Sequence, residues 1–234
     1  MLGTASGQWS NAPGPNTRML TTSVNTQNKQ QAGHCDPTLG RVEVCNDDYG
    51  NTGWLGVAQI WIYTGSSHIA QGTVELNDYY FSGGGSSYQF NNSAEKQHVV
   101  CQEVGHTFGL DHQSTSGASL DTCMDYYHNT SSGDTKSTRP NNVDFGELTC
   151  IYDPTWNHKK LSTPVNTLYA NYTHNCRGTG HVDSFNSAGA QPTGKYFPGA
   201  KASFAPGTQV AENEYVDHLP DGGLLVTFVT PANR

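Results

Sequence analysis

The chain has 234 residues, enough for one sizeable hydrophobic core or for a core domain with a small appendage. Charged residues make up only 14% of it and the net charge is −8 without any basic cluster, so nucleic acid is not an expected partner. No apolar run is long enough for a membrane span, and no signal peptide opens the chain. With 26 glycines and an even count of six cysteines, the composition is typical of a loop-rich, secreted protein.

The first 34 residues are polar and are interrupted by Gly, Pro and Asn. Only residues 19–24 (MLTTSV) have the pattern of a short strand, and no helix is predicted in this part of the chain.

Three β-type segments follow, at residues 41–45, 57–63 and 68–76. The loop between the first two carries oxygen donors of the kind that bind calcium, namely Asp47, Asp48 and Asn51. Their spacing does not match an EF-hand loop, so we interpret the loop as a solvated turn and keep calcium as an unsupported alternative.

The next predicted element is a helix that begins near Asn92, because Asn92 followed by Glu95 resembles a capping box. Its apolar side would make core contacts through Val99, Val100, Val104 and Phe108.

This helix carries the spacing Q-E-x-x-H-x-x-G-x-x-H. Gln102 and His106 are four residues apart, so on a helix they share a face and can point at one ion. Glu103 lies one step round, where it would reach a water on that ion. Gly109 lets the backbone leave the helix, so that His112 can return as a third ligand. Three ligands with one open position are typical of catalytic metal sites.

With a histidine at position 102, this pattern would be the long zinc-binding signature of the metzincin metallopeptidases, and the chain resembles that clan. The resemblance implies that Gln102, His106 and His112 bind the metal and that Glu103 is the general base. Algal gametolysin-type peptidases carry a similar pattern with Gln, which implies that Gln is compatible with activity and that copper can replace zinc. The alternative is a decayed site that keeps the fold without the chemistry.

A second motif supports the resemblance. The sequence Cys123-Met124-Asp125-Tyr126 is similar to the Met-turn of metzincins, in which the methionine forms a hydrophobic floor beneath the metal site. In the astacin and serralysin branches a tyrosine two residues later approaches the metal, and Tyr126 has that position. His98 is an alternative ligand one turn before Gln102, although a supporting or solvated role is the preferred interpretation.

The implied fold is α+β: a metzincin-like twisted mixed β-sheet with an active-site helix and a C-terminal helix, over residues 1–155. The C-terminal helix is predicted at residues 143–152, after Pro140-Asn141. The strand at residues 68–76 precedes the active-site helix, so we expect it to form the rim of the cleft and to pair with the substrate backbone. The strand and long helix that normally open a metzincin domain are not evident, so the N-terminal part is expected to be truncated or reduced.

Residues 156–234 show no helical period and are expected to form a small β-rich appendage. Its strands are predicted at residues 167–172, 210–216 and 224–229, with a hairpin turn at residues 221–223.

Six cysteines allow fifteen pairings. The simplest set joins neighbours along the chain: Cys35 with Cys45, Cys101 with Cys123, and Cys150 with Cys176. The middle bridge would tie the motif helix to the Met-turn. Cys101 adjoins Gln102 but lies off the face of the proposed ligands, so a disulfide is the preferred interpretation over a metal ligand.

We therefore predict a secreted metalloendopeptidase that acts on a protein or peptide substrate with zinc, or copper as the alternative ion. Met124 would be structural and Tyr126 would stabilise the oxyanion. The competing hypothesis is a catalytically inactive metzincin-like module that binds a peptide or acts as a surface module.

Overall fold

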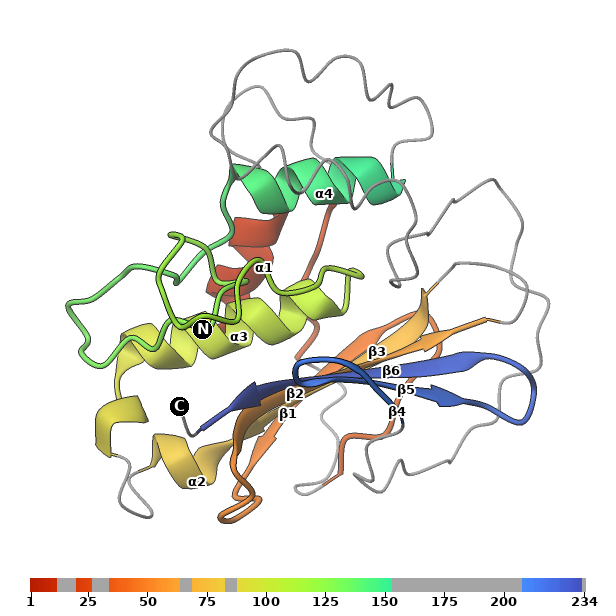
Figure 1. The fold of residues 1–234 in the computed structure, drawn as a ribbon, viewed down its shortest axis with the longest axis horizontal. Coiled ribbons are helices and arrows are strands. Elements are labelled where there is room, and N and C mark those ends of the chain that lie inside the picture. The colour runs from red at the N-terminus through yellow and green to blue at the C-terminus, as the bar shows by residue number, and fades with distance from the viewer. Residues whose placement is uncertain (12–19, 27–33, 64–68, 83–87, 153–207, 233–234) are drawn as a thin grey trace.

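A computed structural model of the chain describes residues 1–11, 20–26, 34–63, 69–82, 88–152 and 208–232. These residues form an α+β fold in which one six-stranded mixed sheet carries helix α3 on one face (Figure 1). The helices are α1 (Leu2–Ser10), α2 (Asp78–Phe81), α3 (Ser93–His106) and α4 (Asn142–Tyr152), with a 3-10 turn η1 at Tyr88–Phe90. The strands are β1 (Val42–Asp47), β2 (Trp54–Ile62), β3 (Ile69–Asn77), β4 (Thr208–Ala211), β5 (Glu214–His218) and β6 (Leu224–Pro231).

The strands lie in the order β1-β3-β2-β6-β5-β4. β1 and β3 are parallel, and the other neighbours are antiparallel. All nine residues of β2 are buried, because α3 covers one face of the sheet there and a second apolar cluster covers the other. Strand β2 is therefore the strand on which the motif helix rests.

The predicted strands β1, β2 and β3 are confirmed, with boundaries shifted by up to three residues. The predicted start of the motif helix is also confirmed: the Asn92 side chain accepts hydrogen bonds from the backbone N–H groups of Ala94 and Glu95. The C-terminal helix of the predicted domain corresponds to α4.

The N-terminal prediction was wrong in two places. Residues 20–24 form no strand, and residues 2–10 form helix α1 although Gly3 and Gly7 lower its intrinsic propensity. Tertiary packing outweighs that propensity. Trp9 is buried against α3, its indole N–H donates to the Cys101 carbonyl at 3.0 Å, and its ring meets Phe145 edge-on at 6.0 Å.

The C-terminal strands do not form the separate appendage that we expected. β6 pairs with β2 along its whole length, and β5 and β4 extend the sheet beyond it. The hairpin turn predicted at residues 221–223 is confirmed between β5 and β6, with Gly222 at a φ of 83°. The single strand expected at residues 210–216 is instead a hairpin of β4 and β5, and the strand predicted at residues 167–172 lies outside the described residues.

The expectation that residues 68–76 would form a free cleft rim was also wrong. β3 is paired with β1 on one side and with β2 on the other, so its backbone groups are not available to a peptide.

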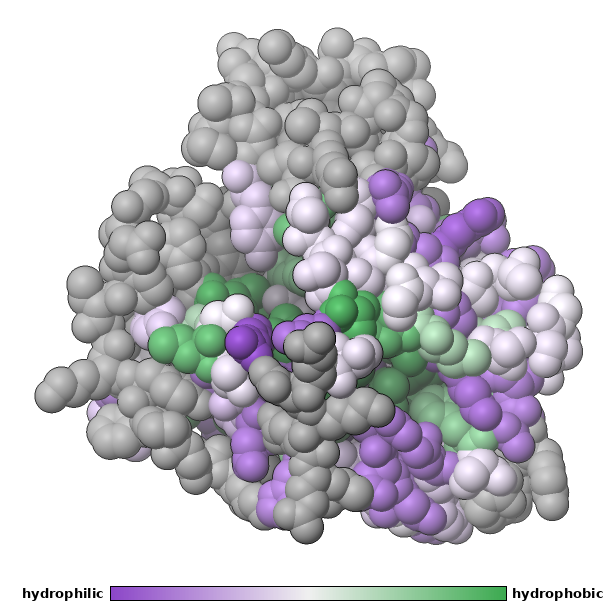
Figure 2. Space-filling view, turned by 180° about the vertical axis from the view of Figure 1, so that it is seen from behind, coloured by the Kyte–Doolittle hydropathy of each residue, from purple (hydrophilic) through white to green (hydrophobic). Residues whose placement is uncertain are grey.

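Two of the predicted disulfides are confirmed, Cys35–Cys45 and Cys101–Cys123. The predicted partner Cys176 lies outside the described residues. Among the helices that the structure describes, none is both long and apolar enough to cross a lipid bilayer. On the side of the molecule opposite to Figure 1, apolar residues gather across the middle of the face and polar residues border them (Figure 2).

Two helical glycines give a matched test of this packing. A Cβ at Gly105 in α3 would lie 2.5 Å from the Met124 sulfur and 2.6 Å from Trp9, whereas a Cβ at Gly7 in α1 meets nothing within 4 Å. Gly105→Ala is therefore expected to lower the free energy of unfolding by about 1–3 kcal/mol. Gly7→Ala is expected to raise it by about 0.5–1 kcal/mol. Urea unfolding of both variants measures the two changes, and equal effects would contradict the close approach of α1, α3 and the Met124 turn.

Candidate active site

The motif residues lie where the C-terminal half of α3 meets β6 and the loop around Met124. Each of them is at most 8% exposed: Gln102, Glu103, His106, His112 and Tyr126. As predicted from the sequence, Gly109 turns the chain after the helix, with a φ of 85°, and this turn brings His112 back toward α3.

The structure brings the two motif histidines together. The Nε2 atoms of His106 and His112 are 2.9 Å apart. The Nδ1 atom of His106 lies 2.8 Å from the Leu110 carbonyl, so Nδ1 carries a proton and Nε2 presents its lone pair to His112. Burial and the neighbouring imidazole of His112 lower the pKa of His106 well below its ordinary value. His106 is therefore a neutral imidazole whose Nε2 lone pair is directed at His112, and a neutral imidazole is the form that binds metal ions.

Gln102 is oriented by a hydrogen bond from its side-chain amide. Nε2 donates to the Asp125 carbonyl at 2.9 Å, and His98 Nε2 lies 2.9 Å from the same carbonyl. Because the amide nitrogen is held by the Met124 turn, Oε1 points the other way and accepts from the Thr230 hydroxyl at 2.5 Å. His98 thus supports the turn and does not lie beside the His106–His112 pair.

Glu103 is buried next to the same threonine. Its Oε1 lies 2.6 Å from the Thr230 hydroxyl, and its Oε2 has no hydrogen-bond partner among the described residues. Burial raises the pKa of Glu103 to about 8, and the hydrogen bond to Thr230 only partly opposes this. Thr230 has one hydroxyl proton for two acceptors. A protonated Glu103 resolves this, since it donates to Thr230 while Thr230 donates to Gln102.

Tyr126 and Met124 complete the arrangement from the other side. The Tyr126 hydroxyl lies 3.3 Å from His112 Nδ1 and donates to the Val229 carbonyl at 3.3 Å. Met124 is fully buried, and its sulfur packs on the backbone of Gly105, one residue before His106. The Cys101–Cys123 disulfide fixes this turn to α3.

The residues that β6 contributes to the site were missed in the sequence analysis. The Phe228 ring stacks on the His106 imidazole, with centroids 4.3 Å apart and planes inclined by 2°. Thr230 joins Gln102 to Glu103 from 127 and 128 residues away in the sequence. The continuous apolar pattern of residues 224–229 was a usable signal, because a strand apolar on both faces is typical of the middle of a sheet.

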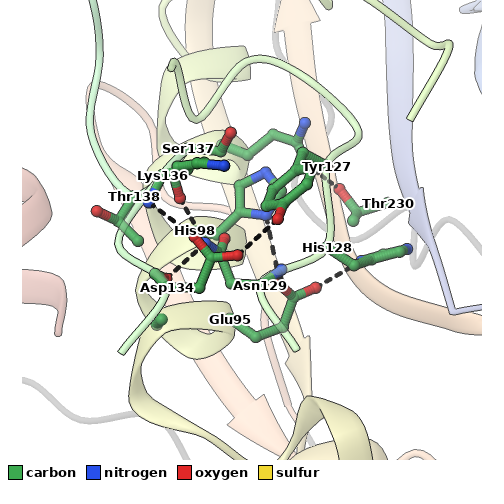
Figure 3. A network of polar contacts seen from close by, with 12 residues as sticks. Glu95, His98, Tyr127, His128, Asn129, Asp134, Lys136, Ser137, Thr138 and Thr230 are labelled. Carbon is green, nitrogen blue, oxygen red and sulfur yellow. Dashed lines mark hydrogen bonds and ion pairs between the residues drawn. The ribbon is translucent and has the colours of Figure 1, made fainter. Parts of the chain in front are cut away.

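A second network of polar contacts holds the loop that follows Tyr126 to the start of α3 (Figure 3). Glu95 accepts from His128 Nδ1 at 2.6 Å and from the Asn129 N–H at 2.6 Å, and it lies 3.6 Å from His98 Nδ1. Glu95 was expected to close a capping box onto Asn92, but its carboxylate reaches across to this loop instead.

The nitrogens of His106 and His112 have nearly the spacing and orientation that a bound metal ion requires. Two imidazole nitrogens on one tetrahedral zinc ion lie roughly 3.3 Å apart, so the 2.9 Å of the histidine pair would have to lengthen slightly. The outer nitrogens are held by Leu110 and Tyr126, the usual way of orienting metal-binding imidazoles. Within the described residues no group of three His, Cys, Asp or Glu is placed to hold an ion, so a third ligand for the histidine pair would have to be of another residue type. The pair fits two imidazole ligands of a metal ion, whereas the Gln102 oxygen, the third ligand predicted from the sequence, accepts a hydrogen bond from the Thr230 hydroxyl in this structure.

The acidic loop after β1 does not present its oxygens to a common point. Asp47 accepts from the N–H of Asp48, Asp48 accepts from the N–H of Gly50, and the Asn51 oxygen accepts from the Tyr80 hydroxyl. These contacts are those of a solvated turn.

Comparison with protein-family models, with curated proteins and with solved structures gives no match for this chain. The resemblance to the metzincins stays a prediction that rests on the motif residues.

The Glu95 network makes stability depend on acid. Burial by itself raises the pKa of Glu95, but hydrogen bonds from His128 and His98 outweigh it and lower the pKa to about 2. Because the folded pKa lies below the ordinary value of 4.5, the stabilisation is present above pH 4.5 and is lost as the pH falls toward 2. We expect the wild type to lose roughly 1–3 kcal/mol over this range and Glu95→Gln to lose less. Urea unfolding at several pH values measures both slopes, and equal slopes would contradict the buried ion pair.

Proposed function

We propose that the chain is a metalloendopeptidase whose site is built from Gln102, Glu103, His106, His112 and Tyr126. The observation that carries the proposal is the convergence of the two histidine Nε2 atoms, 2.9 Å apart, with a tyrosine hydroxyl beside one of them. A carboxylate next to the first ligand position completes the set of groups that metal-assisted peptide hydrolysis needs. The two disulfides fit a protein that works outside the cell, which is the proposed localisation.

In this proposal a bound zinc or copper ion supplies Lewis-acid chemistry, which polarises a carbonyl and acidifies water. His106, His112 and the Gln102 oxygen hold the ion. Glu103 takes the proton of the attacking water and delivers it to the leaving amine. Tyr126 donates a hydrogen bond to the oxyanion that develops on the scissile carbonyl. Met124 supports the site from beneath without taking part in proton transfer.

Gln102 decides which ion the site prefers. A neutral carboxamide oxygen is a weaker zinc ligand than imidazole, and Cu²⁺ binds mixed nitrogen and oxygen sites more tightly than Zn²⁺. A weakened zinc site therefore gives copper an advantage, and copper is the alternative ion in this proposal.

Gln102→His tests the ligand assignment. The substitution restores a third imidazole, so the zinc affinity is expected to rise by about tenfold or more. Competition against a zinc-binding dye measures this affinity in the wild type and the variant. Gln97→His, on the same helix but outside the site, is the matched control. An affinity that rises equally in both variants would contradict the role of Gln102.

The second candidate function is a peptide-binding or surface module without catalysis. The observation that favours it is the state of Glu103, whose burial raises its pKa to about 8, so that it is mostly protonated at neutral pH and a poor base. In this reading the protein binds peptides, and chelators do not change the binding.

Glu103→Gln separates the two functions. Removal of the general base is expected to lower the cleavage of casein at least about a hundredfold while the bound metal is retained. Glu75→Gln, a carboxyl on β3 away from the site, is the control and is expected to keep the wild-type rate. Cleavage that survives in Glu103→Gln and is insensitive to chelators would rule the metallopeptidase out.

A further inference from the structure

Three consecutive residues of β6 contact the whole candidate site. The Phe228 ring covers the His106 imidazole, the Val229 carbonyl accepts from the Tyr126 hydroxyl, and the Thr230 hydroxyl contacts both Gln102 and Glu103. Side chains alternate along a strand, so Phe228 and Thr230 face α3 while Thr227 and Val229 face the other side of the sheet.

These contacts close the site. Glu103 and His106 are 0% exposed and Tyr126 is 2% exposed. A peptidase must bring a substrate carbonyl to these same groups. In this structure the space beside them is filled by the backbone and side chains of β6.

β6 lies along β2 as an added peptide strand would, and its other side is paired with β5, so β5 and β4 would move with it. β6 and β2 are antiparallel, and their register runs from Trp54 opposite Pro231 to Ile62 opposite Leu224, with an irregularity between Trp54 and Gly56. Strand addition to a sheet edge is an ordinary mode of peptide recognition, with backbone hydrogen bonds for affinity and alternate side chains for specificity. Without β6, the edge of β2 would lie open directly beside the site.

Gly56 of β2 shows how closely Glu103 of α3 packs against the β2 strand beside β6. It lies opposite Thr230 in the register, and a Cβ there would come within 2.6 Å of the Glu103 Oε1. Because residue 56 has no side chain, there is room on β2 for the Glu103 side chain, next to Thr230 of β6.

Val229 and Thr230 contact the two proposed catalytic residues, Tyr126 and Glu103. The Val229 carbonyl has the hydrogen bond from Tyr126 that the proposed mechanism gives to a scissile carbonyl. The Thr230 hydroxyl lies against Glu103, where the mechanism puts the attacking water.

We propose that β6 is an internal occupant of the substrate groove, in which residues 228–230 take the place of an extended peptide along β2 and keep the site latent until β6 separates from β2. The inference rests on the proposed function, since it assigns a regulation to the same site. It also defines the substrate as an extended peptide that pairs with β2, with an aromatic side chain accepted next to His106.

A matched set of threonine variants in β6 tests the inference. Thr230→Ala removes the hydroxyl that contacts Gln102 and Glu103. Thr227→Ala removes a hydroxyl of the same strand that pairs with Gln59 on the opposite face, at similar burial. Thr230→Ser keeps the hydroxyl. Loss of one hydrogen bond that holds β6 in place, whether to the site or to Gln59 of β2, favours separation of β6 by roughly fivefold. We therefore expect casein cleavage by the zinc-loaded full chain to rise about fivefold in Thr230→Ala and in Thr227→Ala, and to stay at the wild-type rate in Thr230→Ser.

Amide hydrogen exchange of the same four proteins provides a readout that does not depend on activity. The inference predicts that the amides of β6 exchange faster than those of β3 in Thr230→Ala, through an opening smaller than global unfolding. Measurable cleavage that is equal in all four proteins would overturn the latency. If none of the four proteins cleaves casein, the proposed peptidase function is rejected, and hydrogen exchange then tests only whether β6 separates from β2. Faster exchange of β6 then supports a separable strand, and exchange of β6 and β3 together overturns it.

Discussion

The contact of the Thr230 hydroxyl with Gln102 and Glu103 is the interaction that holds β6 against the candidate site. It joins the motif helix to the central sheet at the two residues whose chemistry is in question. Burial raises the pKa of Glu103 to about 8, and the hydrogen bond with Thr230 only partly opposes this. The proposed separation of β6 would therefore change both the access to the site and the burial of its proposed base.

A disulfide and several hydrogen bonds hold the Met124 turn against α3, beside the candidate site. The Cys101–Cys123 disulfide and the Asp125 carbonyl, shared by Gln102 and His98, fix the turn to α3. The pairing of Glu95 with His128 fixes the following loop. As a result, Tyr126 and His112 meet His106 with little freedom. Such support would favour the proposed metal binding through one weak ligand, since preorganised ligands lose less entropy on binding.

Local signals in the sequence predicted local structure. The Asn92 cap, the turn at Gly109 and the two described disulfides join residues close in the chain, and all of them are present. Helix α1 was missed because its glycines disfavour a helix, and it is stabilised by tertiary contacts such as the burial of Trp9 against α3. The placement of β6 could not be predicted, because strand order depends on pairings between residues more than a hundred positions apart. The same long-range pairing explains why Phe228 and Thr230 were absent from the predicted site.

The central claim is that two imidazoles and the Gln102 oxygen bind one metal ion. X-ray absorption spectroscopy of the full chain, loaded with one equivalent of zinc and then with copper, tests it most directly. We predict a spectrum with two imidazole nitrogens and oxygen ligands, and loss of that spectrum when His106 and His112 are both changed to alanine. A spectrum without imidazole scattering, or one that is unchanged in the double variant, would contradict the proposed metal site.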